Sequence, residues 1–377
     1  NNNFQELFPL SVAILLNKRH FSKQKKKLTL LALFFQEKLA LIFARISTFI
    51  GAKLNKMKKI FSIIVFITVF VSCDQKSKVK KAVEEIPLEI KVDRFDKLFF
   101  ETEPKNLSQL KKQFPFFFPP GNNDSIWLEK MQNPLWRELY AEVQKKYSNF
   151  EPTKKELNTV LKHIKYYFPE SKTPKVITVI SEMDYNNKII YTDSLMIISL
   201  EMYLGKNHKF YQFPNYLKQN FEQRQIIPDL VSSFSIQKIT PISDNNLLSQ
   251  MIYYGKQLYL KDLLIPEYTD ADKIGYTPEQ NIWCEENEGY MWRYFLENQL
   301  LYSDDQKLGN RFINPAPFSK FYLEIDNESP GRVGTWIGWQ MVRSFMKNND
   351  VSVHNMLKMN PKELFEKSKY KPKKNDE

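Results

Sequence analysis

The chain has 377 residues, of which 42% are hydrophobic and 14% aromatic, so it is long enough to bury a sizeable core. Its formal net charge is +12, but the first 72 residues hold 12 of the 55 Lys and Arg and only 2 of the 43 Asp and Glu. Residues 73–377 therefore contain 43 basic and 41 acidic residues. This balance argues against a nucleic-acid-binding protein, which needs a concentrated basic face.

Residues 1–56 contain no Met and lack the pattern of a domain. A basic cluster at 23–27 precedes two apolar patches that charged residues interrupt. We interpret this segment as an over-extended gene model that is absent from the cellular protein. The alternative is a basic, amphipathic arm that lies on a membrane surface.

Residues 57–73 combine a short basic region, an apolar run and a cysteine. Two Lys follow Met57, and 13 uncharged, mostly apolar residues occupy 60–72. A membrane span needs about 20 residues, so this run is too short. It ends in Phe-Val-Ser-Cys, which resembles a bacterial lipobox and implies a signal peptide over 57–72, cleavage before Cys73 and acylation of Cys73. The alternatives are a plain signal peptide or part of a spanning helix.

The rest of the chain divides into three parts. Residues 73–90 are charged and without strong periodicity, which predicts a tether between lipid and domain. A single globular domain is expected over 91–370, followed by a disordered basic tail over 371–377. With Cys73 acylated, Cys284 has no disulfide partner, and we expect it to be a small buried residue.

The domain begins with helical patterns and continues with strands. One helix is predicted around 125–147. Thr153 and Glu156 fit a capping box, so the next helix is predicted to begin at Thr153. Three short segments rich in β-branched residues then predict strands of one sheet, over 175–183, 188–194 and 194–204.

Helical patterns fill the C-terminal half. Apolar residues recur at helical spacing over 243–266, 286–302 and 334–346. Thr277 and Asn360 have the sequence of helix N-caps, each followed by Pro at the first helical position. The predicted fold is α+β, mostly helical with one small sheet.

Common catalytic and metal-binding motifs are absent from the sequence. The four His stand far apart, and there is no H-E-x-x-H, C-x-x-C, G-x-S-x-G or glycine-rich phosphate loop. We therefore predict no metal and no cofactor. Glu285, Glu286 and Glu288 form an acidic cluster, which we interpret as stabilising a helix N-terminus rather than as an acid–base pair.

Five stretches are distinctive when taken together: "QIIPDLVSSF", "GKQLYLKDLLIPE", "IGYTPEQNIWCEENEGYMWRYFLENQLLYSDD", "RFINPAPFSKFYLEIDNESPGRVGTWIGWQMVRSFM" and "ELFEKSKYKP". With the lipobox, they resemble the gliding motility lipoprotein family GldB of the Bacteroidota over essentially all of 57–377. The resemblance implies an envelope lipoprotein required for gliding, a process coupled to type IX protein secretion. The family signature falls on these residues of the chain: Glu288, Trp292, Arg311, Pro315, Pro330, Gly331, Gly334, Trp336, Gly338 and Trp339.

The same resemblance implies a location and partners. The chain would be lipid-anchored in the cell envelope through Cys73, with its domain facing the periplasm and its contacts made to gliding motility or secretion proteins. Asp74 follows the cysteine, and sorting rules for this position differ between bacterial groups, so the choice between inner and outer membrane stays open.

A more distant similarity links this family to zincin-type metallopeptidases. If "QIIPDLVSSF" occupies the metal-binding helix, Pro228, Asp229 and Ser232 fall within the stretch where H-E-x-x-H would stand, and Tyr254 stands where a ligand Glu would be expected. Proline has no donor atom for a metal, and serine is a poor replacement for imidazole. We expect a zincin-like scaffold without its metal site, which acts by protein–protein contact and not by catalysis. The alternatives are a hydrolase or peptidase with an unusual site, and a carbohydrate or peptide binder that uses exposed Trp and Tyr.

Overall fold

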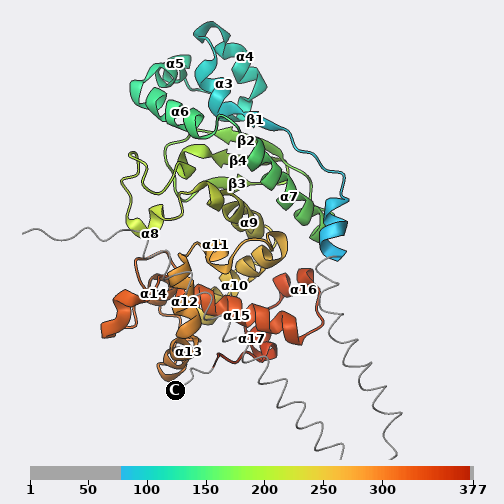
Figure 1. Ribbon diagram of the computed structural model, residues 1–377, viewed down its shortest axis with the longest axis vertical. Coiled ribbons are helices and arrows are strands. Elements are labelled where there is room, and N and C mark those ends of the chain that lie inside the picture. The colour runs from blue at the N-terminus through green and yellow to red at the C-terminus, as the bar shows by residue number, and fades with distance from the viewer. Residues whose placement is uncertain (1–77, 374–377) are drawn as a thin grey trace, which may run out of the picture. The chain divides into compact units, whose positions relative to one another are not determined.

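The structure, a computed structural model, describes residues 78–373 (Figure 1). The residues from Lys81 onward form one compact unit, and the fold below is that of this unit. The predicted gene-model extension, the signal peptide and Cys73 lie outside the described residues, as do residues 374–377 of the predicted tail.

The compact unit begins within the segment that the sequence assigns to a tether. Val83 and Ile90 are each 3% exposed. Asn158 accepts a hydrogen bond from the Ile90 backbone (3.1 Å) and donates one to the Leu88 carbonyl (3.0 Å). Residues 81–90 therefore pack with the folded unit, ahead of the expected boundary at residue 91.

Four strands form one mixed sheet in the order β1-β2-β4-β3 (Figure 1). They are β1 (Val92–Arg94), β2 (Lys175–Val179), β3 (Ile189–Tyr191) and β4 (Leu195–Ser199). The first three in this order are parallel, and β3 pairs antiparallel with β4 at the edge. The three predicted strands are confirmed as β2, β3 and β4, although β4 ends at Ser199, where a 3-10 turn begins. β1 is missing from the prediction because three residues are too few to show an alternation.

Helices α3 to α6 cover one face of the sheet. They are α3 (Phe95–Glu101), α4 (Leu107–Gln113), α5 (Asp124–Gln132) and α6 (Pro134–Lys146). Ile177 and Val179 of β2 point to this face and join an aromatic cluster with Phe95 and Phe99. The single helix predicted over 125–147 is wrong, because Asn133 caps a new helix and Pro134 occupies its first turn.

The opposite face packs against α7 (Glu151–Tyr167) and α9 (Ile226–Ile236), where Val176 of β2 enters the main core. The predicted start of α7 at Thr153 is wrong by two residues. Thr153 is buried inside the helix, and its hydroxyl accepts a hydrogen bond from Gln223 (3.0 Å) instead of capping the backbone.

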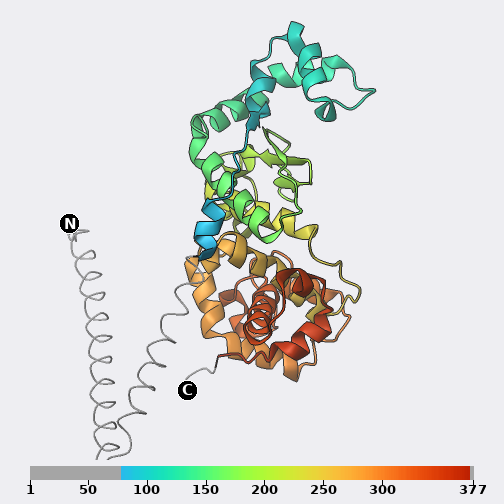
Figure 2. The same cartoon turned by 90° about the vertical axis from the view of Figure 1, so that its right-hand side faces the viewer.

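The C-terminal half is helical and gathers at one end of the unit, with the sheet between it and α3–α6 (Figure 2). After the short α8 (Asn215–Lys218) and α9, it contains α10 (Leu247–Leu264), α11 (Asp270–Ile274), α12 (Pro278–Glu286), α13 (Glu288–Glu297), α14 (Lys307–Phe312), α15 (Val333–Asn348), α16 (Val353–Lys358) and α17 (Pro361–Ser368). The predicted caps at Thr277 and Asn360 are confirmed, since each side chain accepts from backbone N–H groups of the first turn. Cys284 is free and buried, as predicted.

The predicted class, α+β with mostly helices and one small sheet, is confirmed. Within residues 78–373, no helix combines the length and apolarity that a bilayer crossing requires.

Candidate functional site

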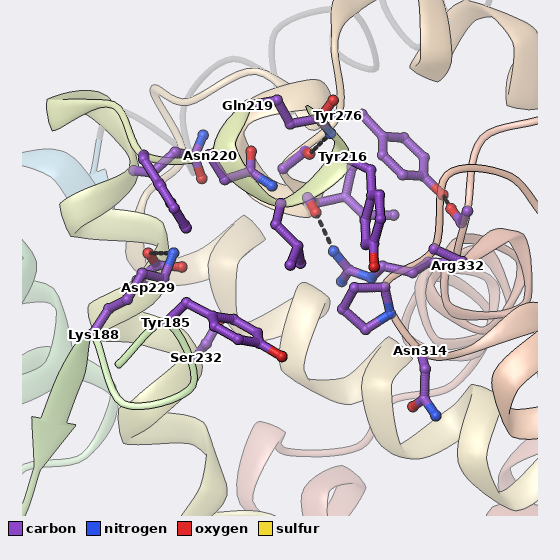
Figure 3. Close-up of a pocket in the computed structure, with 18 of the residues that line it drawn as sticks. Tyr185, Lys188, Tyr216, Gln219, Asn220, Asp229, Ser232, Tyr276, Asn314 and Arg332 are labelled. Atoms are coloured by element: carbon purple, nitrogen blue, oxygen red, sulfur yellow. Dashed lines mark hydrogen bonds and ion pairs between the residues drawn. The ribbon is translucent and has the colours of Figure 1, made fainter. Parts of the chain in front are cut away.

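A cavity of about 390 Å³ lies where α8, α9 and α10 meet three loops of the helical half (Figure 3). The loops are residues 275–276, which follow α11, 313–316 and 331–332. This volume is in the range of small-molecule sites. The charged side chains that line it are Lys188, Asp229, Lys261 and Arg332.

Helix α9 supplies Asp229 from its first turn. The Asp229 Oδ2 atom accepts a hydrogen bond from the Tyr203 hydroxyl (2.9 Å) and lies 2.5 Å from Lys188 Nζ. Burial, followed by the nearby Asp229 charge, raises the pKa of Tyr203 well above its usual range, so its hydroxyl stays protonated and can donate. Asp229 and Lys188 form a neutral pair on one wall of the cavity (Figure 3).

Ser232 lies one turn further along α9 and also lines the cavity. Its hydroxyl donates to the carbonyl of Pro228, four residues earlier (3.1 Å). Pro228 itself is buried in the first helical turn, where a missing N–H group is tolerated, and is not among the lining residues.

Lys261 reaches the cavity from α10. The residue is 6% exposed, and its Nζ atom donates to the Lys273 carbonyl (2.6 Å). Burial lowers the pKa of Lys261 to about 7, against an ordinary value of 10.5; Asp229 opposes this shift, and Arg332 and Lys188 reinforce it by repulsion. Within residues 78–373, no carboxylate lies within 4.0 Å of the Lys261 ammonium.

Arg332 closes the opposite wall in a strained backbone conformation. It has φ 69° and ψ 24°, in the left-handed region that non-glycine residues seldom adopt, and it immediately precedes α15. Its Nη1 atom donates to the Ile274 carbonyl (2.8 Å). Strain at a cavity wall is a common feature of functional sites.

The backbone next to Arg332 is packed too tightly for a side chain. A Cβ atom on Gly331 would overlap with the Ala316 carbonyl oxygen. The Tyr276 hydroxyl donates to the Gly331 carbonyl (2.5 Å). These contacts join the three loops and hold the position of Arg332.

Uncharged polar groups complete the lining. Gln219 donates to the Gly275 carbonyl (3.1 Å), while Asn220, Tyr185 and Tyr216 also line the cavity (Figure 3). Amide and phenol groups donate and accept hydrogen bonds, so the cavity suits a ligand that is polar along its length.

The residues singled out by the zincin similarity are partly brought together. Asp229, Ser232 and Tyr254 line one cavity, and Pro228 does not. Within residues 78–373, the structure places no three His, Cys, Asp or Glu side chains as a metal-binding group. The sequence prediction missed Lys188, Lys261 and Arg332. The signal for Lys261 was its place beside Asp262 within an otherwise apolar run of α10, "LYLKDLL".

The family-signature residues divide between the cavity and the core. Pro315 and Gly331 line the cavity. Glu288 is 4% exposed and accepts from the Tyr370 hydroxyl (2.8 Å), and Trp292 packs edge-on against Tyr370. These last contacts tie α13 to the segment that follows α17.

Arg311 holds the loop after α14 and lies apart from the cavity. Its Nε atom donates to the Lys320 carbonyl (2.8 Å), and its guanidinium lies over the Tyr322 ring at 4.5 Å. The Pro330 carbonyl accepts from the buried Ser319 hydroxyl (2.8 Å).

The remaining signature residues belong to α15 and its packing. The Trp336 indole donates to Asn281 (3.2 Å) and the Trp339 indole donates to Asp262 (2.9 Å). Gly334 and Gly338 allow neighbouring backbone to approach closely. These residues stabilise the helical half, and the sequence alone did not separate this role from a functional one.

A second cavity of about 460 Å³ lies beside α3 and the sheet, and its walls are mostly apolar, with four Phe and one Trp among the lining residues. Glu201 is fully buried near it, and its Oε1 atom accepts from Ser181, which lines this cavity (2.6 Å). Burial raises the pKa of Glu201 to about 7, partly offset by the Ser181 hydrogen bond.

Comparison with known proteins adds one finding. The profile of a family described as "Gliding motility protein GldB" matches residues 76–372, which is well over half of the chain and includes every cavity residue named above. No curated protein and no solved structure matches the chain.

Proposed function

The chain belongs to the family of the gliding motility protein GldB, and from this membership we propose that it is an envelope lipoprotein of the gliding machinery. We propose further that this machinery is coupled to type IX secretion and that the protein acts by binding and not by catalysis. Its role as a gliding motility lipoprotein follows from the family. The coupling to secretion, the anchor at Cys73, the periplasm-facing orientation and the absence of catalysis belong to the proposal.

The observation that supports binding over catalysis is the pairing of Asp229. A carboxylate can act as a general base only if it is available to a substrate proton. The Asp229 carboxylate already accepts from Tyr203 and is paired with Lys188. Its neighbours at the proposed ligand positions, Ser232 and Tyr254, have hydroxyl groups in place of imidazole and carboxylate.

The zincin-like scaffold is part of this proposal. The zincin similarity implies a helix, a sheet, the metal-binding helix and then further helices. It receives support from the chain order of α7, strands β2 to β4, α9 and the helices after α9. On this view, α9 and α10 kept their places around the cavity while their ligand residues changed.

A hydrolase or peptidase with an unusual site is the second candidate. Lys261 favours it, because a buried lysine with a pKa lowered to about 7 beside a cavity is typical of active sites. The two candidates differ in what they expect from the Asp229 carboxylate in living cells. A catalytic carboxylate would be required for gliding, whereas a carboxylate that is only paired with Lys188 would not be.

The test is gliding of cells that carry single substitutions in the chromosomal gene. Asp229→Asn keeps the size of the side chain, and we expect such cells to glide, whereas Cys73→Ala cells lose gliding. Loss of gliding in Asp229→Asn cells that contain normal amounts of folded protein would favour the catalytic candidate and overturn the proposal.

A further inference from the structure

The charges around the α9–α10 cavity do not balance. Asp229 is neutralised by Lys188. Asp262, which follows Lys261 on α10, is paired with Arg343 (2.7 Å) and Lys273 (2.9 Å). Lys261 and Arg332 have no carboxylate within 4.0 Å among residues 78–373, so two cations face the cavity without a counter-charge.

An unpaired cation in a buried position is unfavourable unless it loses its proton or gains an anion. Lys261 can release its proton, whereas the guanidinium of Arg332 remains charged. An anion between the two side chains would stabilise both. Both side chains line the same cavity, and the Arg332 charge repels the Lys261 ammonium.

The Arg332 guanidinium is already oriented to bind an anion in the cavity. Its Nη1 atom is fixed on the Ile274 carbonyl (2.8 Å), and the described residues provide no hydrogen-bond acceptor for its Nε and Nη2 atoms. Gly331 and Tyr276 fix the backbone beside it. The N–H groups of a fixed, planar guanidinium match the two oxygens of a carboxylate, and prior ordering lowers the cost of binding.

We propose that this cavity binds the carboxylate of a small acidic ligand, or of the acidic end of a chain, between Lys261 and Arg332. The cavity volume of about 390 Å³ has room only for a small molecule or for the last residues of a chain. Asn220, Tyr185 and Tyr216 then contact its polar body (Figure 3). This inference rests on the proposed function of the cavity in binding and names the class of ligand.

A carboxylate of this kind has two sources, the C-terminus of a peptide and an acidic sugar. Isothermal titration calorimetry on the full chain separates them with matched probes. The peptide probes are acetyl-Ala-Ala with a free carboxylate and the same dipeptide as its amide. The sugar probes are galacturonate and galactose, and inorganic phosphate tests for a different anion.

We expect at least one acid to bind at least tenfold more tightly than its neutral counterpart and more tightly than phosphate. Equal binding of acid and neutral probe, absence of binding by both acids, or tighter binding of phosphate would each overturn the proposal.

Two lysines on α10 provide a matched pair of variants. Lys256 is 2% exposed and donates to the Leu357 and Met359 carbonyls, away from the cavity. We expect Lys261→Met and Arg332→Met to weaken acid binding at least tenfold and Lys256→Met to leave it unchanged. Equal weakening by Lys256→Met would show that the effect is structural and would contradict the proposal. Arg332→Lys keeps the charge but loses the planar set of N–H donors, so its affinity for the acid is expected to lie between those of the parent chain and Arg332→Met.

The outcome is separable from the proposed function. If Cys73→Ala cells lose gliding and Asp229→Asn cells glide while no acid binds, only the carboxylate inference fails. If an acid binds as expected but Asp229→Asn cells do not glide, the non-catalytic function fails and the site remains an acid-binding site.

Discussion

Gly255 of α10 and Gly338 of α15 face each other where these two helices cross, and neither has space for a side chain. A Cβ atom on Gly255 would overlap with the Gly338 carbonyl, and one on Gly338 would overlap with the Met251 carbonyl. The crossing therefore depends on direct backbone contact. Because α10 also supplies Lys261 and α15 follows Arg332, this contact sets the distance between the two sides of the cavity.

The first prediction concerns this crossing. Gly338→Ala is expected to lower the free energy of unfolding by about 3 kcal/mol or more, because backbone atoms, unlike a flexible side chain, cannot move aside. Gly309→Ala in α14 is the control, since its nearest neighbour is the flexible end of Gln250 at 3.1 Å. Urea unfolding followed by circular dichroism measures both, and equal stability of the two variants would contradict the role of the crossing.

The second prediction concerns the buried lysines of α10. Burial lowers the pKa of Lys261 to about 7 and that of Lys256 to about 8, from 10.5. Between the lowered pKa of each lysine and its ordinary value of 10.5, the unfolded chain keeps a proton that the folded protein has released. The contribution of the two lysines to the free energy of unfolding therefore rises with pH from about 7 to 10. Lys261→Met is expected to flatten the rise in urea unfolding between pH 6.5 and 9.5. An unchanged slope would show that Lys261 keeps an ordinary pKa.

The third prediction concerns Glu201, whose pKa burial raises from 4.5 to about 7. Between these values the folded protein holds a proton that the unfolded chain has lost. The contribution of Glu201 to the free energy of unfolding is therefore fully present below about pH 4.5, and it is lost as pH rises through 7. Glu201→Gln keeps a hydrogen-bonding side chain without the charge, and it is expected to be more stable than the parent chain at pH 8 by on the order of 3 kcal/mol. A gain that is no larger at pH 8 than at pH 5 would contradict this assignment.

The fourth prediction concerns the pH dependence of acid binding. The charged groups that face Lys261 are Asp229 on α9, Lys188 at the start of β3 and Arg332 before α15. Of the two cations that we assign to the carboxylate, Lys261 is the one whose pKa burial lowers, to about 7. The affinity for the acid probe is expected to fall between pH 6 and 8.5, by up to about tenfold for each pH unit above 7. In Lys261→Met this dependence is expected to disappear, and a fall that persists in the variant would assign the titration to another group.

Local sequence signals determined a large part of this structure. The period of apolar residues predicted the helices of the C-terminal half, and β-branched segments predicted β2, β3 and β4. The caps at Thr277 and Asn360 act within one helical turn, so nearby residues were sufficient to reveal them. The same cap-and-proline signal at Asn133 and Pro134 was overlooked, and the capping-box sequence at Thr153 lies inside a helix, so both predicted helix boundaries were wrong.

The family of the protein was also readable from the sequence, since distinctive strings recur between residues 225 and 372, within the stretch 76–372 that the family profile matches. The charge imbalance of the cavity was decided only by the tertiary structure. Lys261 and Arg332 are 71 positions apart and carry no motif, and one cavity joins them because α10 and α15 cross at Gly255 and Gly338. Whether a lysine is solvated or buried without a carboxylate depends on which distant segments surround it, and that is a property of packing and not of neighbouring residues in the chain.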